Sequence, residues 1–338
     1  MKISENIPIS KLTTMRLGGN ARYVIEVTSE EDVPKAYLFA TEHNLPVYVL
    51  GYGSNIIGRD GGFDGVIIVN KIKGMGVYAE EENGRIQLYS NSGEMLDDFV
   101  QYSTKMGFSG MEALSAIPGT VGAAPVQNVG AYGQDIGQTL VFVRAYDTLL
   151  EDYVELMKID LDLSYRHSIF NSGKTVGRYF ITKIVVELKR GELKPPFYNS
   201  LQKYLEDNNI TEYSPETIRK AVRAVRESKL PDPEEIASSG SFFKNVYLTK
   251  PEEIAAAKAR GIPVWDGGKI PSGWLIENAG LKGRVFHGMK VSDKASLVLI
   301  NESAQNYSDL AAAREEIIEK VREKYGYTLE QEPMELGK

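Results

Sequence analysis

The sequence predicts an α+β protein divided into three parts, and three observations lead to this expectation. With 338 residues the chain is too long for one ordinary hydrophobic core, so two or three domains are expected. Helical and strand patterns are mixed over residues 1–70, whereas residues 71–190 are richer in strand patterns. From 192 to 209 the chain becomes polar and contains Pro195-Pro196, which indicates a crossover into a third part.

The first part contains a helix followed by buried strands. Ser29 and Asp32 form a capping-box pattern at the start of a helix, and the strand PVYVL follows at 46–50. GVIIV at 65–69 predicts another buried strand. Residues 1–70 therefore form a small α/β unit.

The second part combines one helix with long strands. A helix is expected over 94–106, ended by Gly107. Strands are expected at 139–146 and 179–188, and the second alternates as a strand with one exposed face does.

The third part begins with helices that carry their own start and stop signals. Ser214 caps a helix whose first residue is Pro215, and Thr249 with Glu252 forms a capping box that opens another helix. Gly261 closes this second helix.

A long amphipathic helix over 308–325, stopped by Gly326, completes the third part. We therefore expect units at 1–70, 71–205 and 206–326, and a tail at 327–338 that packs back on the body.

Composition excludes several classes of protein. The net charge of −7 argues against nucleic-acid binding, and hydrophobic and charged contents of 42% and 25% are typical of soluble proteins. The absence of cysteine excludes disulfides, zinc–thiolate sites, iron–sulfur clusters and thiol-linked cofactors, and no metal site is expected. Neither a signal peptide nor a membrane-spanning run is present, so a cytoplasmic protein without membrane contact is expected.

Two glycine-rich segments are the strongest functional signal. The segment IPGTVGAAPVQNVGAYG at 117–133 has little bulk to bury, and GYGSN stands at 51–55. Such segments allow main-chain N–H groups to approach a pyrophosphate or a flat ring closely. A single segment of this kind is more often a simple turn, but two of them favour a large bound nucleotide.

Neither segment matches a common nucleotide-binding motif. Ile56 stands where G-x-G-x-x-G requires glycine, and Ser168 stands where a P-loop ending at 173–175 would begin. The Ser54 hydroxyl and the Asn55 amide are left to hold phosphate oxygens outside a Rossmann frame.

Several polar side chains could act on a substrate. Ser241, in GSFFKN, lacks the context of a nucleophile, so it is either a turn serine or a hydroxyl that donates a proton. Lys229, Lys244 and Arg226 suit a diphosphate, although each alone is more often a surface charge. Arg166, between aromatic and apolar neighbours, is either a carboxylate clamp or a structural ion pair.

Seven runs occur together in order: LGYGSNII, IPGTVGAAPVQNVGAYG, LSYRHSIF, KLPDP, SGSFFKN, PSGWLIENAGLKG and LVLIN. In this order and spacing the chain resembles the UDP-N-acetylenolpyruvoylglucosamine reductase family from Thr13 to Gly337. The form AAPVQN and the surroundings of Tyr198 resemble the family's first type, which has a tyrosine-bearing loop over the substrate.

The resemblance implies a pair of vanillyl-alcohol-oxidase-like (PCMH-type) domains that bind FAD without a covalent link, followed by an α+β substrate domain. The positions that correspond to the family's flavin-binding residues are Gly51, Tyr52, Gly53, Ser54, Asn55, Ile117, Pro118, Gly119, Ala123, Ala124, Val126, Gln127, Asn128, Gly130 and Tyr132.

The resemblance also implies the catalytic and substrate-binding residues. The proton-donating serine falls on Ser241, the arginine that faces the substrate carboxylate on Arg166, and the tail glutamate on Glu332, with Glu335 as its rival. Sugar-nucleotide contacts fall on Tyr198, Lys229, Asn245, Trp265 and Lys269.

The implied function is NADPH-dependent reduction of an enolpyruvyl ether to UDP-N-acetylmuramate, a peptidoglycan precursor, by a monomer. Another FAD-dependent oxidase or dehydrogenase of the same fold, and a nucleotide-sugar-binding protein without redox activity, are the alternatives. The chain departs from the family at Val246 (usually proline), His167 (usually aspartate) and Ala295 (often glutamine or histidine), and the last puts one substrate contact in doubt.

Overall fold

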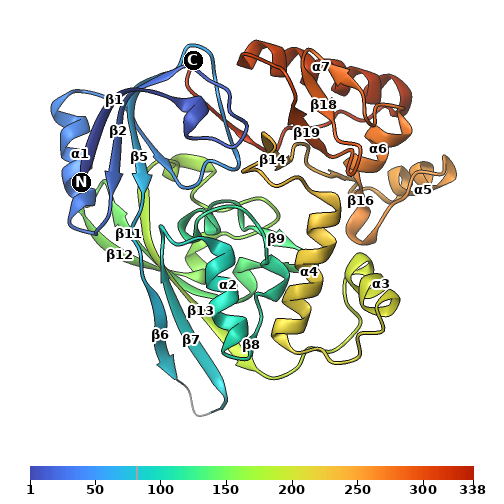
Figure 1. The fold of residues 1–338 in the computed structure, drawn as a ribbon, viewed down its shortest axis with the longest axis horizontal. Coiled ribbons are helices and arrows are strands. Elements are labelled where there is room, and N and C mark those ends of the chain that lie inside the picture. Colours follow the sequence, from blue (N-terminus) through green and yellow to red (C-terminus); the bar gives the residue numbers. More distant parts are fainter. Residues whose placement is uncertain (81–82) are drawn as a thin grey trace. The chain divides into compact units, whose positions relative to one another are not determined.

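The computed structural model describes residues 1–80 and 83–338, and Figure 1 follows the chain through its labelled elements. The chain forms two compact units. The first unit comprises residues 1–6, 21–52 and 64–227; the second comprises 7–20, 53–63 and 228–338. Both units are therefore assembled from segments that are distant in sequence.

Seven α-helices are found in the described part of the chain. They are α1 (Asp32–Glu42), α2 (Leu96–Lys105), α3 (Asn199–Asp207), α4 (Pro215–Lys229), α5 (Pro251–Ala259), α6 (Ser272–Asn278) and α7 (Tyr307–Tyr325). In none of the described helices is there an apolar stretch long enough to cross a membrane.

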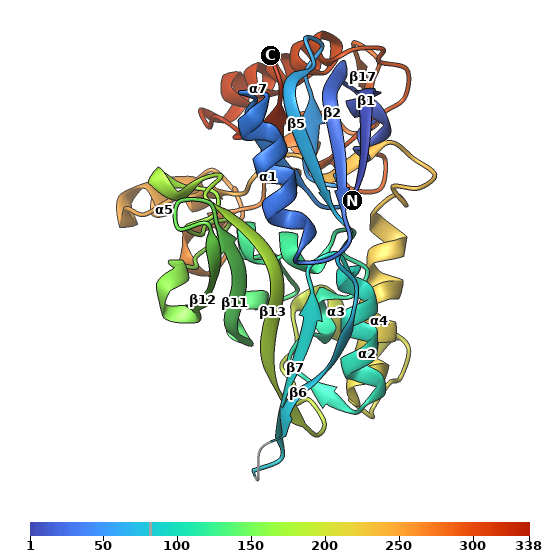
Figure 2. The ribbon, with the colours of Figure 1, turned by 90° about the vertical axis from the view of Figure 1, so that its left-hand side faces the viewer.

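A four-stranded sheet in the order β1-β2-β5-β3 forms one part of the first unit. Its strands are β1 (Lys2–Pro8), β2 (Asn20–Val27), β5 (Phe63–Asn70) and β3 (Val47–Leu50), of which β3 and β5 are parallel. The buried face of α1 packs on this sheet, with Val33 and Ala36 in one cluster with Ile25 and Ile68. Figure 2 shows α1 beside β5.

A larger antiparallel sheet, in the order β12-β11-β13-β7-β6, forms the rest of the first unit's framework, and β8 pairs with β13. The strands are β12 (Asp152–Met157), β11 (Leu140–Asp147), β13 (Tyr179–Arg190), β7 (Arg85–Asn91), β6 (Met75–Glu80) and β8 (Phe108–Ser109).

The prediction that β13 has one exposed face is wrong, because both faces of this strand are covered. Ile184 packs with Phe99 and Val100 of α2, whereas Phe180 joins the cluster that contains Val33 of α1. A strand buried on both faces loses the alternation that an exposed face would impose.

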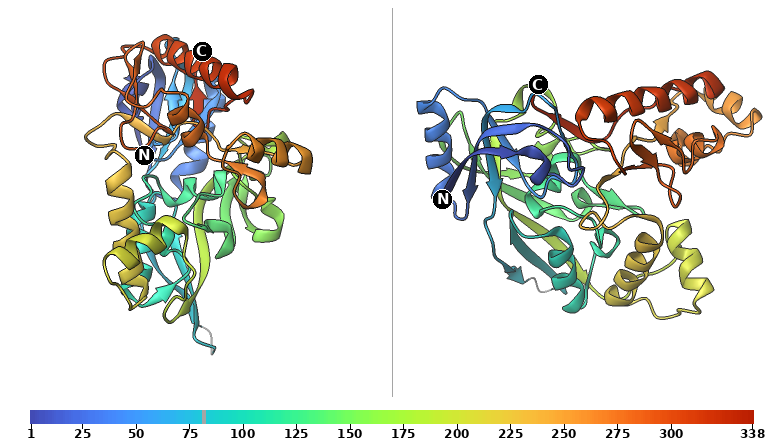
Figure 3. Two further views of the ribbon diagram at one scale, coloured as in Figure 1. Left: turned by 90° about the vertical axis from the view of Figure 1, so that its right-hand side faces the viewer. Right: turned by 45° about the horizontal axis from the view of Figure 1, so that its top comes forward.

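The second unit is built on a sheet in the order β14-β19-β18-β17, with two short strand pairs beside it. The elements are β14 (Ser238–Ser241), β19 (Val298–Asn301), β18 (Met289–Val291), β17 (Val285–Phe286), the pair β15 (Val246–Tyr247) and β16 (Lys269–Ile270), and the parallel pair β4 (Ile56–Gly58) and β20 (Met334–Leu336). Leu310, Ile317 and Val321 of α7 pack on Met289 and Leu299 of this sheet. Figure 3 shows α7 running beside it.

Some of the predicted helix signals are confirmed and others are wrong. Ser214 does cap α4, because its Oγ accepts from the Thr217 N–H at 3.2 Å, and Gly326 ends α7 at φ 81°. Ser29 does not form the predicted box, since Asp32 accepts from the N–H of Thr28 instead.

The predicted box at Thr249 is also wrong. Lys250 occupies the cap position of α5, and its side chain makes no cap hydrogen bond. Pro251, the first residue of the helix, sets the start by its fixed φ.

Candidate functional site

The glycine-rich segment 117–133 lies in the first unit, and many of its main-chain N–H groups are already bonded within the protein. Val121 donates to the Glu94 carbonyl at 2.8 Å and Gly122 to the Ser92 carbonyl at 2.9 Å. Ala123 and Ala124 donate within the segment, to Thr120 and Val121. The expectation of a row of ligand-facing amides is therefore wrong for positions 121–124.

The glycines are needed first for close packing of the chain against itself. A Cβ at Gly51 would lie 2.3 Å from the Thr120 Oγ1, and a Cβ at Gly122 would lie 2.5 Å from the Ser92 Cβ. In the second unit, a Cβ at Gly53 would lie 2.0 Å from the Leu12 carbonyl oxygen. These glycines shape the segments, and the shape in turn leaves a surface for a ligand.

That surface suits a flat ring better than a dense set of donors. Ile117, Pro118 and Val126 are only half-buried, so they leave apolar area exposed beside main chain that carries little bulk. Asn128 is occupied, because its Oδ1 accepts from the Gly137 N–H at 3.0 Å and its Nδ2 donates to a main-chain carbonyl. The exposed apolar area of the segment therefore suits a flat ring such as that of a flavin. Among the described residues, no cluster of His, Asp and Glu could hold a metal ion.

The segment begins at a main-chain position that is clamped on both sides. Ala116 has φ 57°, a conformation that side chains other than glycine adopt rarely. Its N–H donates to the Asp97 Oδ1 at 2.6 Å, and its carbonyl accepts from the Arg226 Nε at 3.2 Å. The carboxylate and the guanidinium therefore fix the peptide that precedes Ile117.

Asp97 is itself held by two further arginines of α4. Arg219, which is 4% exposed, donates from both terminal nitrogens, and its Nη2 lies 2.9 Å from Oδ2. Arg223 donates from Nη1 at 2.7 Å. Burial by itself would raise the pKa of Asp97, but the hydrogen bonds from Arg219 and the Ala116 N–H, with the two positive charges, leave that pKa below its usual value.

Residues expected to bind cofactor and substrate meet at the other end of the segment. The rings of Tyr132 and Tyr198 are in edge contact with centroids 5.7 Å apart, and Tyr132 is hydrogen-bonded to Arg226. Burial raises the pKa of both tyrosines and lowers the pKa of the Arg226 guanidinium. Arg226 therefore contacts both ends of the segment.

The turn that carries Arg166 is attached to the same segment. The Ser168 Oγ donates to the Val126 carbonyl at 2.6 Å, and the Asn128 Nδ2 donates to the Ser164 carbonyl at 3.2 Å. Arg166 has φ 55°, and its guanidinium lies 5.3 Å from the Tyr165 ring centre. Two of the predicted regions are thus adjacent in the first unit.

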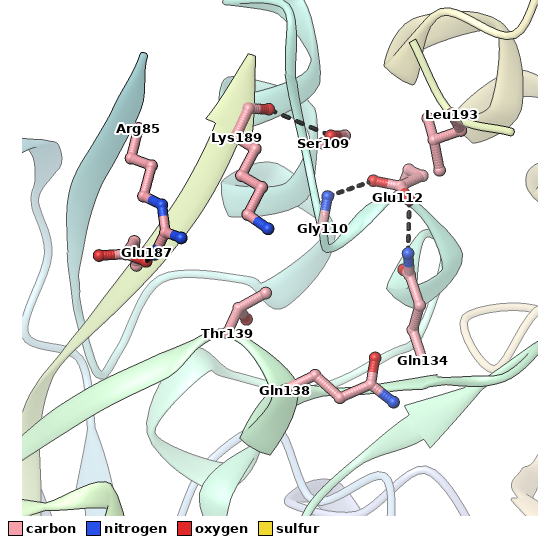
Figure 4. A pocket seen from close by; sticks show the side chains of 10 residues that line it. All are labelled: Arg85, Ser109, Gly110, Glu112, Gln134, Gln138, Thr139, Glu187, Lys189 and Leu193. Atoms are coloured by element: carbon pink, nitrogen blue, oxygen red, sulfur yellow. Dashed lines mark hydrogen bonds and ion pairs between the residues drawn. The ribbon is translucent and has the colours of Figure 1, made fainter. Parts of the chain in front are cut away.

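Beside this segment lies a polar pocket of about 400 Å³, shown in Figure 4. Its carboxylates are occupied: Glu112 accepts from the Gly110 N–H at 2.7 Å and from Gln134 at 2.5 Å, and Glu187 pairs with Arg85 at 2.5 Å. Glu112 and Gln134 flank residues 117–133, so their hydrogen bond closes the base of the glycine-rich segment. None of the predicted site residues lines this pocket, so the pocket is distinct from the predicted site.

Ser241 lies in the second unit, at the end of β14. It pairs with Val298 of β19, and the next residue, Phe242, donates to the Leu297 carbonyl at 2.9 Å. Phe242 and Phe243 are fully buried, whereas Ser241 is half-buried. The strand therefore holds the hydroxyl at the edge of a rigid apolar core.

The tail runs antiparallel to the segment that follows Ser241. The Glu332 N–H donates to the Phe242 carbonyl at 2.9 Å, and the Lys244 N–H donates to the Glu330 carbonyl at 2.8 Å. The structure thus brings the main chains of two predicted catalytic residues, Ser241 and Glu332, together. Glu335 is the alternative tail glutamate, and its carboxylate is bound by two arginines and a tyrosine.

The other predicted residues of the second unit have varied surroundings. Lys244 Nζ lies 3.5 Å from Glu330, and Asn245 Oδ1 accepts from the N–H of Ser272 at 3.2 Å. Burial lowers the pKa of Lys269, whose ammonium lies 4.9 Å from the Trp265 ring centre.

Lys229 is exposed at the end of α4. Val246, at the position where the family usually has proline, pairs with Ile270 across β15 and β16.

Sequence reasoning missed Thr14, which connects two predicted regions of the second unit. Its N–H donates to the Gly53 carbonyl at 3.2 Å, and its Oγ1 donates to the Ser238 carbonyl at 2.6 Å. The main-chain carbonyl of Asn55, two residues after Gly53, accepts from the N–H of Met334 in the tail at 2.9 Å. No local pattern around Thr14 distinguishes it from an ordinary turn residue.

Two family models match the chain. One, described as UDP-N-acetylenolpyruvoylglucosamine reductase, C-terminal domain, matches residues 232–336, and an FAD binding domain matches residues 21–152. The UDP-N-acetylenolpyruvoylglucosamine reductase of Ralstonia nicotianae is 34% identical over 340 residues, which cover 98% of this chain and 98% of that protein. The reductase of the same name from Alcanivorax borkumensis is 36% identical over 294 residues, covering 86% and 84%.

Among solved structures, the UDP-N-acetylenolpyruvylglucosamine reductase of Thermus caldophilus matches with a TM-score of 0.68 at 21% identity, covering 100% of both chains. With the two family models, this match confirms the predicted fold, an FAD-binding domain followed by a C-terminal α+β domain.

Proposed function

This chain belongs to the UDP-N-acetylenolpyruvoylglucosamine reductase family, and we propose that it reduces UDP-N-acetylglucosamine enolpyruvate to UDP-N-acetylmuramate with electrons from NADPH and with FAD as its bound cofactor. We place the reaction in the cytoplasm and assign it to a monomer that makes a precursor of peptidoglycan, on which cell shape and division depend. The observation that carries the proposal is the main-chain pairing of the Ser241 segment with the tail that holds Glu332.

The flavin would lie against the half-buried apolar side chains of Ile117, Pro118 and Val126, and Tyr132 lies at the end of the same segment. The dinucleotide's phosphates would be held at the turn that contains Ser54 and Asn55. When bound, FAD supplies the hydride chemistry, because it can accept a hydride from NADPH and deliver one to a polarised double bond.

Arg166 is proposed to face the substrate carboxylate. Addition of hydride to the terminal carbon of the enol ether moves the electron pair of the double bond onto the neighbouring carbon and its carboxylate. A fixed guanidinium stabilises that charge as it develops, since it is positioned before the reaction and needs no reorganisation. The hydrogen bonds that tie residues 164–168 to Val126 and Asn128 support such a fixed position.

Ser241 is proposed to donate the proton that completes the reduction. The carbanionic carbon takes the hydroxyl proton, and the serine regains a proton from water, so that one hydride and one proton are added in all. Two buried aromatic side chains directly after Ser241 restrict water on that side of the strand.

Glu332 is proposed to assist at the same carbon. An ionised carboxylate beside a growing anion would be repulsive, so we expect Glu332 to be neutral or hydrogen-bonded to a hydroxyl or a cation. Its main-chain bond to Phe242 keeps it next to the proton donor in the second unit.

The sugar nucleotide is proposed to contact Tyr198, Lys229, Asn245, Trp265 and Lys269. The contact between Tyr198 and Tyr132 supports a place for the substrate diphosphate beside the flavin segment. Arg226, half-buried and hydrogen-bonded to Tyr132, adds positive charge there.

The Ser241→Ala substitution tests the proposal, because it separates the two half-reactions. We expect flavin reduction by NADPH to continue at its normal rate, while reoxidation of the reduced protein by the enolpyruvyl substrate falls by about 10²-fold or more. Anaerobic rapid mixing with detection of flavin absorbance measures both steps. Equal slowing of the two steps would show that Ser241 is not the acid.

A further inference from the structure

The tail carries a second acidic residue, Glu335, whose carboxylate is the centre of an ionic cluster in the second unit. Its Oε1 accepts from the Tyr307 hydroxyl at 2.7 Å and from the Arg314 Nη1 at 2.7 Å. Its Oε2 accepts from the Arg59 Nε at 2.7 Å and Nη2 at 2.5 Å. Oε1 also accepts from the Gln331 Nε2 at 3.4 Å, so hydrogen bonds from four residues converge on one carboxylate.

These partners come from three separate segments. Arg59 directly follows β4, Tyr307 and Arg314 belong to α7, and Glu335 lies in β20. The main chain also joins two of these segments, because β20 and β4 pair in parallel with Glu335 opposite Ile57. The cluster therefore fastens the end of the chain to the helix and to the strand after the Ser54 turn.

The same cluster reaches the residues on either side of Glu332. Arg314 Nη1 also donates to the Gln331 Oε1 at 2.8 Å, and the Gln331 Nε2 donates to the Pro333 carbonyl at 2.7 Å. The N–H of Glu332 is bound to Phe242. The position of Glu332 is therefore fixed by the hydrogen bonds of Gln331 and Pro333 on either side and by its own N–H. Arg314 links these bonds to Glu335, because it donates to both Gln331 and Glu335.

The cluster is sheltered enough to act as a rigid anchor. The side chains of Glu335 and Arg314 are only 19% and 18% exposed, so water and salt screen their attraction less than at an open surface. Burial by itself would raise the pKa of Glu335, but the hydrogen bonds from Tyr307, Arg59 and Arg314 leave it below the usual value. The ionised form is therefore the one that the cluster holds.

We propose that Glu335 is a positioning residue for the reduction of the substrate: through Arg314 and Gln331 it sets where Glu332 stands beside Ser241. The inference rests on the proposed function and extends it to a residue that need not contact the substrate. An error of about 1 Å in the placement of a reacting group can cost about 10²-fold in rate, so a loosened tail will affect the protonation step selectively.

The test compares Glu335→Gln with a milder change, Tyr307→Phe, in the full-length protein loaded with FAD. Glu335→Gln is expected to slow reoxidation of the reduced flavin by the enolpyruvyl substrate about tenfold to a hundredfold, and Tyr307→Phe to slow it by less. Flavin reduction by NADPH is expected to be unchanged in both. Glu319→Gln, which breaks the exposed pair with Arg322 on the same helix, is the matched control and is expected to change neither step.

Reoxidation at the normal rate in Glu335→Gln, or equal slowing of both half-reactions, would overturn the inference. If that variant does not fold, Tyr307→Phe decides, and a normal rate of reoxidation in it would likewise overturn the inference. Glu332→Gln separates the two proposals: if it reoxidises normally, the role proposed for Glu332 fails, whereas if it is slow and Glu335→Gln is not, only the positioning role fails.

Discussion

Two carboxylates of this protein are held by similar sets of donors in different units. Asp97 accepts from Arg219, Arg223 and the Ala116 N–H in the first unit, and Glu335 accepts from two arginines and a tyrosine in the second. Asp97 fixes the main chain before the glycine-rich segment 117–133, whereas Glu335 fixes the main chain after Glu332. The protein uses the same chemistry to hold the glycine-rich segment, proposed to contact the flavin, and the tail, which carries the proposed catalytic Glu332.

The clusters differ in burial. Each cluster has one arginine whose side chain is about two-fifths exposed, Arg223 at 41% and Arg59 at 42%. The other arginine differs, because the side chain of Arg219 is 5% exposed and that of Arg314 is 18% exposed. A buried arginine that loses its carboxylate keeps an uncompensated charge, and an exposed arginine is solvated by water instead. Because Arg219 is the more deeply buried, we expect the first cluster to contribute more to the folding stability than the second.

The largest expected effect follows from removing the carboxylate that pairs with the buried Arg219. Asp97→Ala leaves Arg219 buried without its partner and frees the Ala116 N–H, so the free energy of unfolding is expected to fall by about 3 to 5 kcal/mol. Denaturant unfolding of the FAD-free protein measures this loss. Glu216→Gln, which breaks the exposed pair with Lys220 on α4, is the control, with an expected change below about 0.5 kcal/mol. If Asp97→Ala lowered the free energy of unfolding as little as Glu216→Gln does, the proposed contribution of the first cluster to stability would be contradicted.

A smaller loss of stability is expected from the second cluster. Glu335→Gln keeps a hydrogen-bond acceptor for Tyr307, and Arg59 can turn to water, so a loss of about 1 to 2 kcal/mol is expected in the same unfolding measurement. A loss equal to that of Asp97→Ala would show that burial does not distinguish the clusters.

Acid is expected to weaken both clusters. The pKa of each carboxyl is lowered in the folded protein, so its stabilising contribution is complete above the ordinary pKa of the unfolded chain and is lost as the pH falls through the lowered folded-state pKa. Unfolding measured over a series of acidic pH values should show a flatter curve for Asp97→Asn than for the unmodified protein. Parallel curves would contradict an ionised Asp97.

Local patterns predicted some of the helices and missed others. α3 lies within 192–209, which the sequence indicated as a polar crossover, and α6 was not predicted. Ser214 and Gly326 act within one turn of the helix they bound, and both are confirmed. The boxes at Ser29 and Thr249 failed because Glu31 and Lys250 hold the cap positions of α1 and α5, and neither side chain makes a cap hydrogen bond.

The arginine clusters were beyond the reach of local patterns. Arg219, Arg223 and Arg226 are spaced to share one helix face, but their partner Asp97 lies 122 residues before Arg219. The catalytic assignments of Ser241 and Arg166 came from the family resemblance, and they stay predictions. What the structure adds is the set of partners that hold the Glu335 carboxylate, and the choice of Glu332 as the tail glutamate stays a prediction as well.

The visible absorption spectrum of the purified protein tests the central claim, that the glycine-rich segments hold a flavin, most directly. We expect the absorption bands of bound flavin, and we expect the flavin to pass into the supernatant when the protein is denatured. A colourless protein whose melting temperature does not change when FAD is added would contradict it.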